Sequence, residues 1–413
     1  MMGRLKPPLE GHGLEILRAT ILATLFLAAQ PCEAIRAGPD GRTRALVLGD
    51  VIEQYGTYNS FTVVQFDPAV RATMVPTRPD YIGGYENARR NLRLYMPRTY
   101  QRLLEDYDVI ISSDADRRVF ASDWVHWMSD SVIEEGLGIL WLGSIESEIF
   151  VGWQATTVAD VLPATQAPGQ FTREEVFWFV MEDPNEELMK ALPWTESPPL
   201  ANVNAQVPRP ESELWASVDG VFEDHPLITY WEIGKGAALN FASKFPVGVM
   251  PWAKDWDLFP QAMIYLLYRT ADKPIPEDPY MFERVTHAFI RYHSENSLLE
   301  SILAWVEKFG GSTRNLRERL RSLEELRLEA EEAYMNGDFD EALALLGRGE
   351  EDQDAMRAEA IRAKDAALIW IYVTEWCVLM GTLLISSYIL WTLMVRRRLY
   401  REVGLSRLEA AEY

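Results

Sequence analysis

The feature that most constrains this chain is a run of twenty residues without a charged side chain, residues 376–395, which is rich in Leu, Ile and Val. At about 1.5 Å of rise per residue, a helix of this length spans about 30 Å, the thickness of the hydrocarbon core of a bilayer. Aromatic side chains flank both ends of the run, as they do at membrane interfaces: Trp370, Tyr372, Trp376, Tyr388 and Trp391. Four basic residues follow, Arg396, Arg397, Arg398 and Arg401. We therefore predict a transmembrane helix over residues 366–395 and a cytoplasmic tail over 396–413, because basic residues stay on the cytoplasmic side.

The N-terminal segment indicates export. Arg4, Lys6 and Arg18 precede an apolar run over residues 19–29, which has the length of a signal-peptide core. These eleven residues are too few to cross a bilayer as a helix, which takes about 20. We interpret residues 1–37 as a signal peptide, and an uncleaved N-terminal anchor is the alternative. The first interpretation predicts a single-pass protein of the cell membrane with its N-terminal domain outside and its C-terminus in the cytoplasm.

Charge and cysteine content exclude several classes of protein. Asp and Glu number 62 against 40 Lys and Arg, a net charge of −22, which argues against a nucleic-acid binder because phosphates are held by clustered basic residues. The chain is 48% hydrophobic and 11% aromatic, which is too apolar for intrinsic disorder. Its two cysteines, Cys32 and Cys377, lie at or within the apolar terminal segments, so the exported part is held by its core without disulfides.

Residues 40–270 alternate between short apolar segments and helical segments. Strands are expected at residues 44–50, 61–67, 107–114 and 136–144, and helices at 86–105, broken at Pro97, and at 120–135. Short apolar strands that alternate with helices imply a parallel sheet covered on both faces. The predicted fold class is therefore α/β, a flavodoxin-like parallel-sheet domain followed by a helical stalk and one transmembrane helix.

Polar residues follow the ends of these predicted strands, where ligands gather in α/β folds. The candidates for ligand binding are Asp50, Ser113, Asp114, Asp116, Ser144 and Glu146. Asp114 and Asp116, together with Glu146 and Glu148, offer carboxylate ligands to Ca²⁺, and two solvated acidic loops are the simpler interpretation. No His-Glu-x-x-His motif or cysteine pair indicates another metal, and we expect no cofactor.

Several further segments follow one another in a recognisable order. Residues 107–114 and 134–143 are followed by Val161-Leu162-Pro163, by His225-Pro226-Leu227, by residues 231–236 around Gly-Lys-Gly, and by the Trp-rich residues 252–260. This order resembles the class I glutamine amidotransferase-like superfamily, and within it the amidotransferase-like domains of membrane-anchored proteins. The resemblance implies an amidotransferase-like α/β domain over residues 40–270.

The catalytic residues of that superfamily do not carry over. Active members place a cysteine in a sharp strand-to-helix turn, which here reads Leu142-Gly143-Ser144, with Gly143 at or next to the nucleophile position. Their His-x-Glu pair occurs only as His293-Ser294-Glu295, in a predicted helix beyond the domain. We therefore predict a catalytically degenerate member with no catalytic residues. A Ser144 nucleophile with His225 or His126 and Asp114 is the alternative, although Gly-Ser-Ile-Glu departs from Gly-x-Ser-x-Gly and Ser144 more simply caps the next helix.

The rest of the exported part comprises loops and a stalk. Residues 151–230 are proline-rich, and their Trp residues (Trp153, Trp178, Trp194 and Trp215) either pack against the sheet or form a recognition surface. After a stiff linker at 273–279, a helix is expected at 280–309, and a second begins at a Ser312 or Thr313 cap and ends at Asn336-Gly337. Asp338 and Glu341 form a capping box for a following helix, and a last helix after Gly349 runs into the membrane. We assign residues 271–365 to this stalk, whose apolar seam either packs within the chain or forms a dimer.

These features together predict a non-catalytic, membrane-anchored binding or assembly protein of the cell envelope. The alternatives are an envelope hydrolase that uses Ser144 or a metal, and an accessory subunit of a membrane transporter. The expected partners are the membrane, envelope proteins, or a second copy bound through the stalk, and no nucleic acid.

Overall fold

The computed structural model describes residues 38, 40–51, 64–65, 67–143, 147–167, 172–173, 176–220, 225–243, 256–309 and 313–409. The chain forms two compact units. The first comprises residues 1–289 and 334–339, and the second comprises residues 290–333 and 340–413. The turn at 334–339 therefore belongs with the α/β unit, although it lies between two helices of the stalk.

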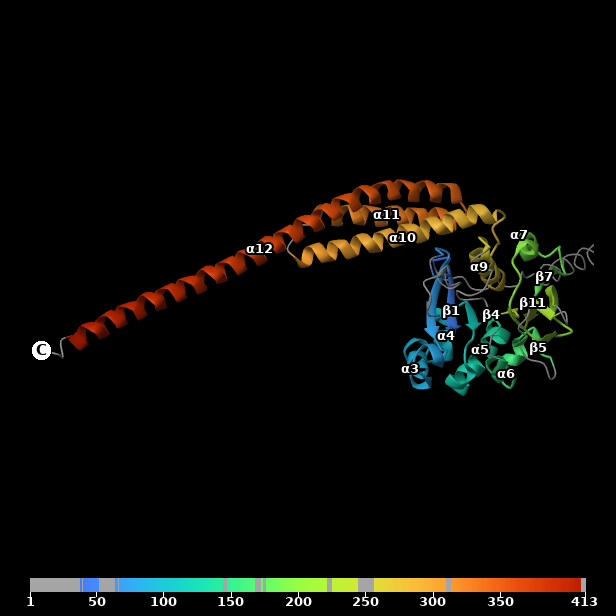
Figure 1. Ribbon diagram of the computed structural model, residues 1–413. Coiled ribbons are helices and arrows are strands. Elements are labelled where there is room, and N and C mark those ends of the chain that lie inside the picture. Colours follow the sequence, from blue (N-terminus) through green and yellow to red (C-terminus); the bar gives the residue numbers. More distant parts are fainter. Residues whose placement is uncertain are drawn as a thin grey trace, which may run out of the picture. The chain divides into compact units, whose positions relative to one another are not determined.

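An eight-stranded sheet forms the centre of the first unit (Figure 1). Five neighbouring strands are parallel, in the order β2 (Val70–Pro76), β1 (Thr43–Gly49), β3 (Val109–Ser113), β4 (Gly138–Leu142) and β12 (Gly236–Phe241). Three antiparallel strands extend the sheet, in the order β11 (His225–Ile233), β10 (Glu213–Asp219) and β7 (Trp178–Met181). The predicted α/β class with a mostly parallel sheet is thus confirmed.

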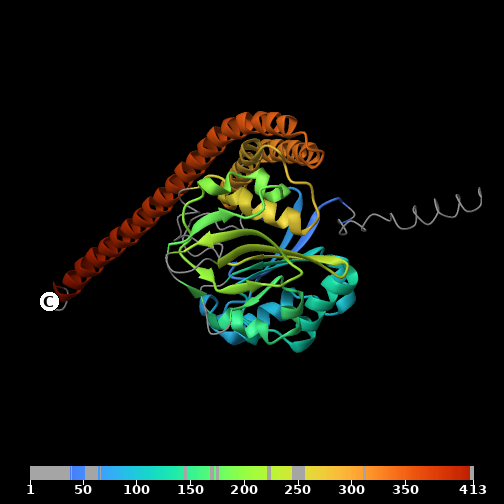
Figure 2. The ribbon, with the colours of Figure 1, turned by 90° about the vertical axis from the view of Figure 1, so that its right-hand side faces the viewer.

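Helices cover both faces of this sheet, as Figure 2 shows. One face carries α3 (Tyr85–Tyr95), α4 (Tyr100–Asp106), α5 (Ser122–Glu135) and α6 (Ser147–Gln154), and the other carries α9 (Phe259–Thr270). On the first face, alternate strand residues pack with the helices into one buried cluster that includes Leu46, Leu48, Ile110, Ile139, Trp141, Leu92, Val125 and Met128. Helix α9 is buried along almost its whole length because it lies on β4 and β12.

Short strands and short helices complete the first unit. Two short ribbons pair β5 (Ala164–Gln166) with β9 (Gln206–Pro208) and β6 (Thr172–Arg173) with β8 (Val203–Asn204). The remaining short helices are α7 (Glu187–Ala191) and the 3-10 turns η1 (Pro79–Tyr81), η2 (Arg117–Val119), η3 (Thr157–Val161) and η4 (Trp194–Glu196).

The second predicted strand was misplaced along the chain. Val64 and Gln65, in the middle of the expected strand at 61–67, are helical, and the parallel strand is β2, at 70–76. Because β2 lies at the edge of the sheet, most of its side chains are only partly buried, and its sequence lacks the continuous apolar run of a central strand. The expected helix at 86–105 does break near Pro97, between α3 and α4.

The second unit is built from three long helices (Figure 1). They are α10 (Pro279–Lys308), α11 (Arg314–Met335) and α12 (Phe339–Glu409). Their apolar positions within this unit are buried: Tyr292, Leu299, Leu303, Val306, Leu316, Leu323, Ala330, Leu346, Met356 and Ala360. Two polar contacts tie the three helices together, because Tyr292 donates its hydroxyl to the Leu323 carbonyl at 2.7 Å and Gln353 donates its amide to the Tyr292 carbonyl at 3.0 Å.

The helix expected after the Asp338 cap and the last helix expected after Gly349 form one helix, α12, which begins at Phe339 and runs through Gly349 without a break. A glycine inside a helix costs only about 1 kcal/mol relative to alanine, which packing can outweigh. The reason for this glycine is a close neighbour: a Cβ placed on Gly349 would lie 2.7 Å from the Tyr292 hydroxyl oxygen.

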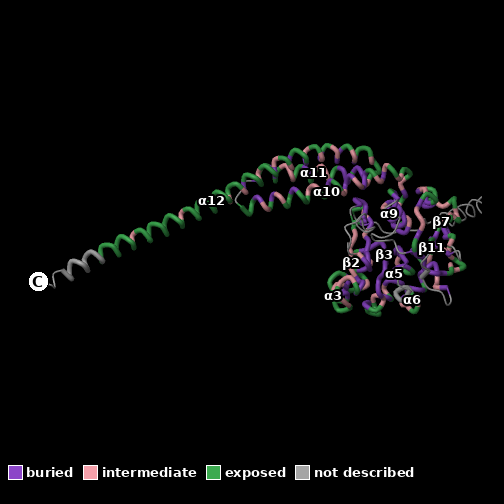
Figure 3. Tube along the Cα trace, viewed as in Figure 1, coloured by how far each residue is buried: buried purple, intermediate pink, exposed green. Residues whose placement is uncertain are grey.

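The C-terminal part of α12, residues 369–400, is exposed or partly exposed along its length (Figure 3). Within the part of the chain that the structure describes, it is the one helix that is long and apolar enough to cross a membrane, with a mean hydropathy of 1.9 in its most apolar stretch. None of that stretch is buried within the protein, unlike the core helix of a water-soluble fold. The helix is therefore consistent with the single-pass anchoring predicted from the sequence.

Candidate binding site at the carboxyl edge of the sheet

The ends of the first three parallel strands are joined by backbone hydrogen bonds. The Asp50 amide, directly after β1, donates to the Ser113 carbonyl at the end of β3 at 2.9 Å. The Thr77 amide, directly after β2, donates to the Gly49 carbonyl at 3.0 Å. The structure therefore brings Asp50, Ser113 and Asp114 to one edge, as the sequence predicts, and adds Thr77 and Arg78 from β2.

A buried ion pair crosses this edge. Arg78 Nη1 lies 2.6 Å from Asp114 Oδ2, and both side chains are almost completely buried. The guanidinium also lies over the Tyr81 ring, at 4.4 Å from its centroid. Asp114 holds this position in the left-handed region, at φ 53°, which side chains other than glycine rarely adopt. Burial of two charges costs free energy, so this ion pair is not by itself a stabilising feature of the edge.

Three hydroxyl groups at the same edge are buried without a hydrogen-bond partner among the described residues. They are Thr77 Oγ1, Ser112 Oγ and Ser113 Oγ. Successive side chains of a strand point to opposite faces, so Ser112 and Ser113 place their hydroxyls on the two sides of β3. A buried polar group left unpaired costs about 1–3 kcal/mol, which a polar ligand would offset.

The turn after β4 leaves no room for a side chain at Gly143. A Cβ on this residue would lie 2.5 Å from Asn204 Oδ1 and 2.7 Å from the Ala242 carbonyl oxygen. The Gly143 amide donates to the carbonyls of Phe241 and Ser243, at 2.8 and 3.0 Å, which holds the turn against the end of β12. No cysteine or serine nucleophile therefore fits at position 143 without a shift of the backbone around it. Ser144 and Glu146, the other candidates of this turn, lie outside the described residues.

Asp116 is buried beside this edge and forms an ion pair with Arg118. Arg118 donates to both of its oxygens through its backbone amide and guanidinium, at 2.8 to 3.2 Å. Burial alone would raise the pKa of Asp116, but the hydrogen bonds from Arg118 outweigh it and hold the pKa below its usual value. The loop is fixed by Trp153, whose indole N–H donates to the Ala115 carbonyl at 2.6 Å.

Two of the four carboxylates that the sequence offered to Ca²⁺ are engaged by arginines, Asp114 by Arg78 and Asp116 by Arg118. Glu146 and the side chain of Glu148 lie outside the described part of the chain. Over the described ranges, no three His, Cys, Asp or Glu side chains come close enough to hold a metal ion.

The histidines of the alternative hydrolase lie in different surroundings. His126 is on the exposed side of α5, where its Nδ1 lies 3.3 Å from Thr157 Oγ1. His225 is buried at the start of β11 beside the Phe177 ring. The His293-Ser294-Glu295 motif lies on α10 in the second unit, outside the α/β unit, as expected.

The tryptophans of the decorating loops divide into two groups. Trp153, Trp194 and Trp215 are completely buried, in agreement with packing against the sheet. Trp178 is 57% exposed on the edge strand β7, with Val176 and Val180 beside it. Only Trp178 is therefore available as part of a recognition surface.

Sequence reasoning missed Thr77 and Arg78 because it placed their strand too early in the chain. The available signal was the segment Val75-Pro76-Thr77-Arg78-Pro79, in which a valine-rich stretch ends in prolines and polar residues as a strand end does.

Comparisons with known proteins leave the family open. No protein-family model and no curated protein matches the chain. Among solved structures, cytoplasmic protein STM3548 from Salmonella typhimurium is 16% identical, with a TM-score of 0.43 over 55% of this chain and 98% of that one. Cytoplasmic protein STM1381 from Salmonella typhimurium LT2 is 18% identical, with a TM-score of 0.42 over 55% and 99%. The exo-beta-1,4-mannosidase Op5Man5 from Opitutaceae bacterium strain TAV5 is 13% identical, with a TM-score of 0.31 over 62% and 38%. These likenesses are too distant to carry an argument about function.

Proposed function

We propose that this chain is a non-catalytic, membrane-anchored binding or assembly protein of the cell envelope, built on an amidotransferase-like α/β domain. In this proposal the α/β domain and the stalk lie outside the cell. The sheet with helices on both faces and the order of the sequence motifs support the flavodoxin-like, amidotransferase-like part of the proposal.

The crowding at Gly143 carries the non-catalytic part of the proposal. A nucleophile in a strand-to-helix turn needs a side chain that projects from the turn toward the substrate. At Gly143 this space is taken by the Asn204 amide oxygen and the Ala242 carbonyl. A side-chain oxygen and a backbone carbonyl therefore both block a projecting side chain at position 143.

The polar groups at the carboxyl edge support a binding role. Ligands of α/β folds bind outside the carboxyl ends of the parallel strands, where the Arg78–Asp114 pair and the Ser113 hydroxyl lie. The Ser113 hydroxyl, which is buried without a hydrogen-bond partner among the described residues, offers both a donor and an acceptor to a polar ligand. The hydrolase alternative is less favoured because its proposed acid, Asp114, is bound to Arg78.

The location rests on α12 and on the four arginines that follow its apolar stretch. Basic residues at the end of a membrane-spanning helix favour the cytoplasmic side. This orientation places the acidic α/β domain on the opposite side of the membrane.

The catalytic part is tested with the full-length chain in lipid nanodiscs. Ammonia release from glutamine and hydrolysis of p-nitrophenyl esters and anilides are measured beside the Ser144→Ala variant. We expect the two proteins to show the same background rates. Turnover that disappears in Ser144→Ala would replace the binding proposal with the hydrolase.

A further inference from the structure

A pocket lies at the amino end of the parallel strands, within the first unit. Its volume is about 370 Å³, within the range of about 300–1,000 Å³ that is common for small-molecule sites. The lining includes Tyr268, Lys273, Phe282, Tyr334, Met335 and Phe339. It also includes Ala69, which immediately precedes β2, so the pocket is at the amino edge and is separate from the carboxyl edge described above.

Aromatic rings form one wall of this pocket. Phe282 packs against Tyr334 and Phe339, with ring centroids 6.0 and 5.9 Å apart, and Tyr334 packs against Phe339 at 5.3 Å. Tilted and edge-to-face contacts between rings are favourable, so these residues present a packed, apolar wall.

A buried carboxylate orients two of the tyrosines. Asp67 is 1% exposed and accepts hydrogen bonds from the Tyr268 hydroxyl at 2.8 Å, the Tyr334 hydroxyl at 3.0 Å and the Ala69 amide at 2.8 Å. Burial raises the pKa of Asp67, so its charged form is disfavoured. The two hydroxyls are directed to Asp67, and their rings are left to contact whatever fills the pocket.

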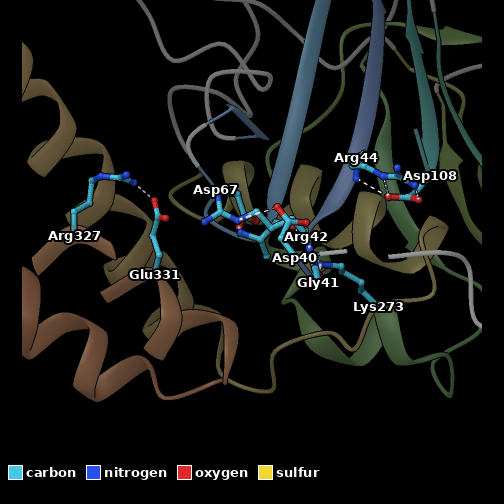
Figure 4. A network of polar contacts seen from close by, with 10 residues as sticks. Asp40, Gly41, Arg42, Arg44, Asp67, Asp108, Lys273, Arg327 and Glu331 are labelled. Atoms are coloured by element: carbon cyan, nitrogen blue, oxygen red, sulfur yellow. Dashed lines mark hydrogen bonds and ion pairs between the residues drawn. The ribbon is translucent and has the colours of Figure 1, made fainter. Parts of the chain in front are cut away.

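Lys273 is the one cationic side chain among the described residues that line the pocket. Figure 4 shows its side chain beside Gly41. Its ammonium lies 3.3 Å from the Gly41 carbonyl and 3.2 Å from the Ala69 carbonyl, and 5.7 Å from the centre of the Tyr268 ring. An ammonium has three N–H donors, so these two carbonyls leave one donor for a ligand. Burial also lowers the pKa of Lys273, which an anion bound beside it would reverse.

We propose that this pocket binds a small organic monoanion, a carboxylate attached to an apolar or aromatic body. The carboxylate accepts the remaining N–H of Lys273, and the body packs on Phe282, Met335 and Phe339. A cationic ligand is disfavoured because Lys273 already occupies the face of Tyr268. The proposal is independent of the function proposed for the carboxyl edge.

The test is calorimetric titration of 4-phenylbutyrate into the full-length chain in nanodiscs, with empty nanodiscs as the blank. We expect saturable binding at one site. Lys273→Gln should weaken it about tenfold or more, because a charge-assisted hydrogen bond is lost. Lys190→Gln, at an exposed lysine of α7, should leave it unchanged. The neutral analogue 4-phenylbutyramide should bind wild type no better than the acid binds Lys273→Gln.

A second variant guards against misfolding of Lys273→Gln. Met335→Trp fills the pocket and keeps the lysine, and it should abolish binding while the circular dichroism spectrum stays that of the wild type. Absence of saturable heat with the wild type would overturn the proposal. Equal affinity in wild type and in a folded Lys273→Gln or Met335→Trp protein would overturn it as well.

Discussion

At Gly143, the neighbours of the Cα atom decide what residue the position tolerates. A Cβ there meets Asn204 Oδ1 at 2.5 Å and the Ala242 carbonyl oxygen at 2.7 Å. Asn204 and Ala242 lie far along the chain from the turn, so their approach is a tertiary effect. The glycine is therefore required for packing between β4, β8 and the end of β12, and the same packing leaves no room for a side chain at position 143.

Gly143→Ala should lower the free energy of unfolding by about 1–3 kcal/mol, because atoms inserted into a packed site force the backbone to shift. Urea unfolding of the full chain in detergent, followed by tryptophan fluorescence, measures this change. Gly152→Ala is the matched control, since a Cβ there lies 3.5 Å from Arg117 Cβ, an ordinary contact. Equal stability of the two variants would contradict the crowding described for the turn.

Asp67 makes the stability of the α/β unit depend on pH. Burial raises its pKa in the folded state above the ordinary value of 3.8. A carboxyl group whose pKa is raised by folding contributes to the free energy of unfolding. This contribution is complete below the unfolded pKa of 3.8 and is lost as the pH rises through the folded pKa. The loss arises because the folded state must then hold a buried charge or release the carboxyl from its site.

Asp67→Asn should remove this dependence, since the amide has no proton to lose. Between pH 4 and pH 8, we expect the melting temperature of Asp67→Asn relative to wild type to rise with pH until the pH passes the folded pKa of Asp67, and then to level off. Melting curves of both proteins at intervals of one pH unit provide the measurement. A difference that stays constant over this range would show that the Asp67 carboxyl does not titrate as described.

At the scale of elements, α12 shows how packing overrides a local signal. Gly347 and Gly349 both favour a break in the helix, and the helix continues through both. The two glycines differ in their surroundings: a Cβ on Gly347 meets nothing within 4 Å, whereas a Cβ on Gly349 meets the Tyr292 ring. Tyr292 cannot easily move aside because its hydroxyl is bonded to the Leu323 carbonyl.

The two alanine variants should therefore act in opposite directions. Gly347→Ala should stabilise the helical unit by about 0.5–1 kcal/mol, through helix propensity alone. Gly349→Ala should destabilise it by about 1–3 kcal/mol, through the clash with Tyr292. Thermal unfolding followed by circular dichroism at 222 nm compares them, and destabilisation of similar size in both would refute the role given to Tyr292.

Strand β2 is the opposite case, because its short-range sequence pattern was too weakly apolar to predict a strand. Its edge position leaves three consecutive side chains partly exposed, so an apolar pattern is not required of it. The central strands β3 and β4 are buried at every position, and their apolar runs predicted them correctly.

At the scale of the whole molecule, the proposed orientation has a direct test. Green fluorescent protein fused after Tyr413 should fluoresce, and alkaline phosphatase at the same place should be inactive, because the C-terminus is proposed to be cytoplasmic. Replacement of Arg396, Arg397, Arg398 and Arg401 by asparagine should lower the fluorescent fraction. An active phosphatase fusion of the wild-type chain would reverse the proposed orientation.

The amino-acid sequence alone determined the class of the fold, the helical stalk and a helix that is long and apolar enough to cross a membrane. Each of these depends on composition and periodicity within a short window, such as the uncharged residues 376–395. Only the tertiary structure decided the Arg78–Asp114 pair, the crowding at Gly143 and the joining of Asp67 to Tyr268 and Tyr334, which are 201 and 267 residues further along the chain. These contacts depend on which segments the sheet brings side by side, and no local pattern encodes that choice.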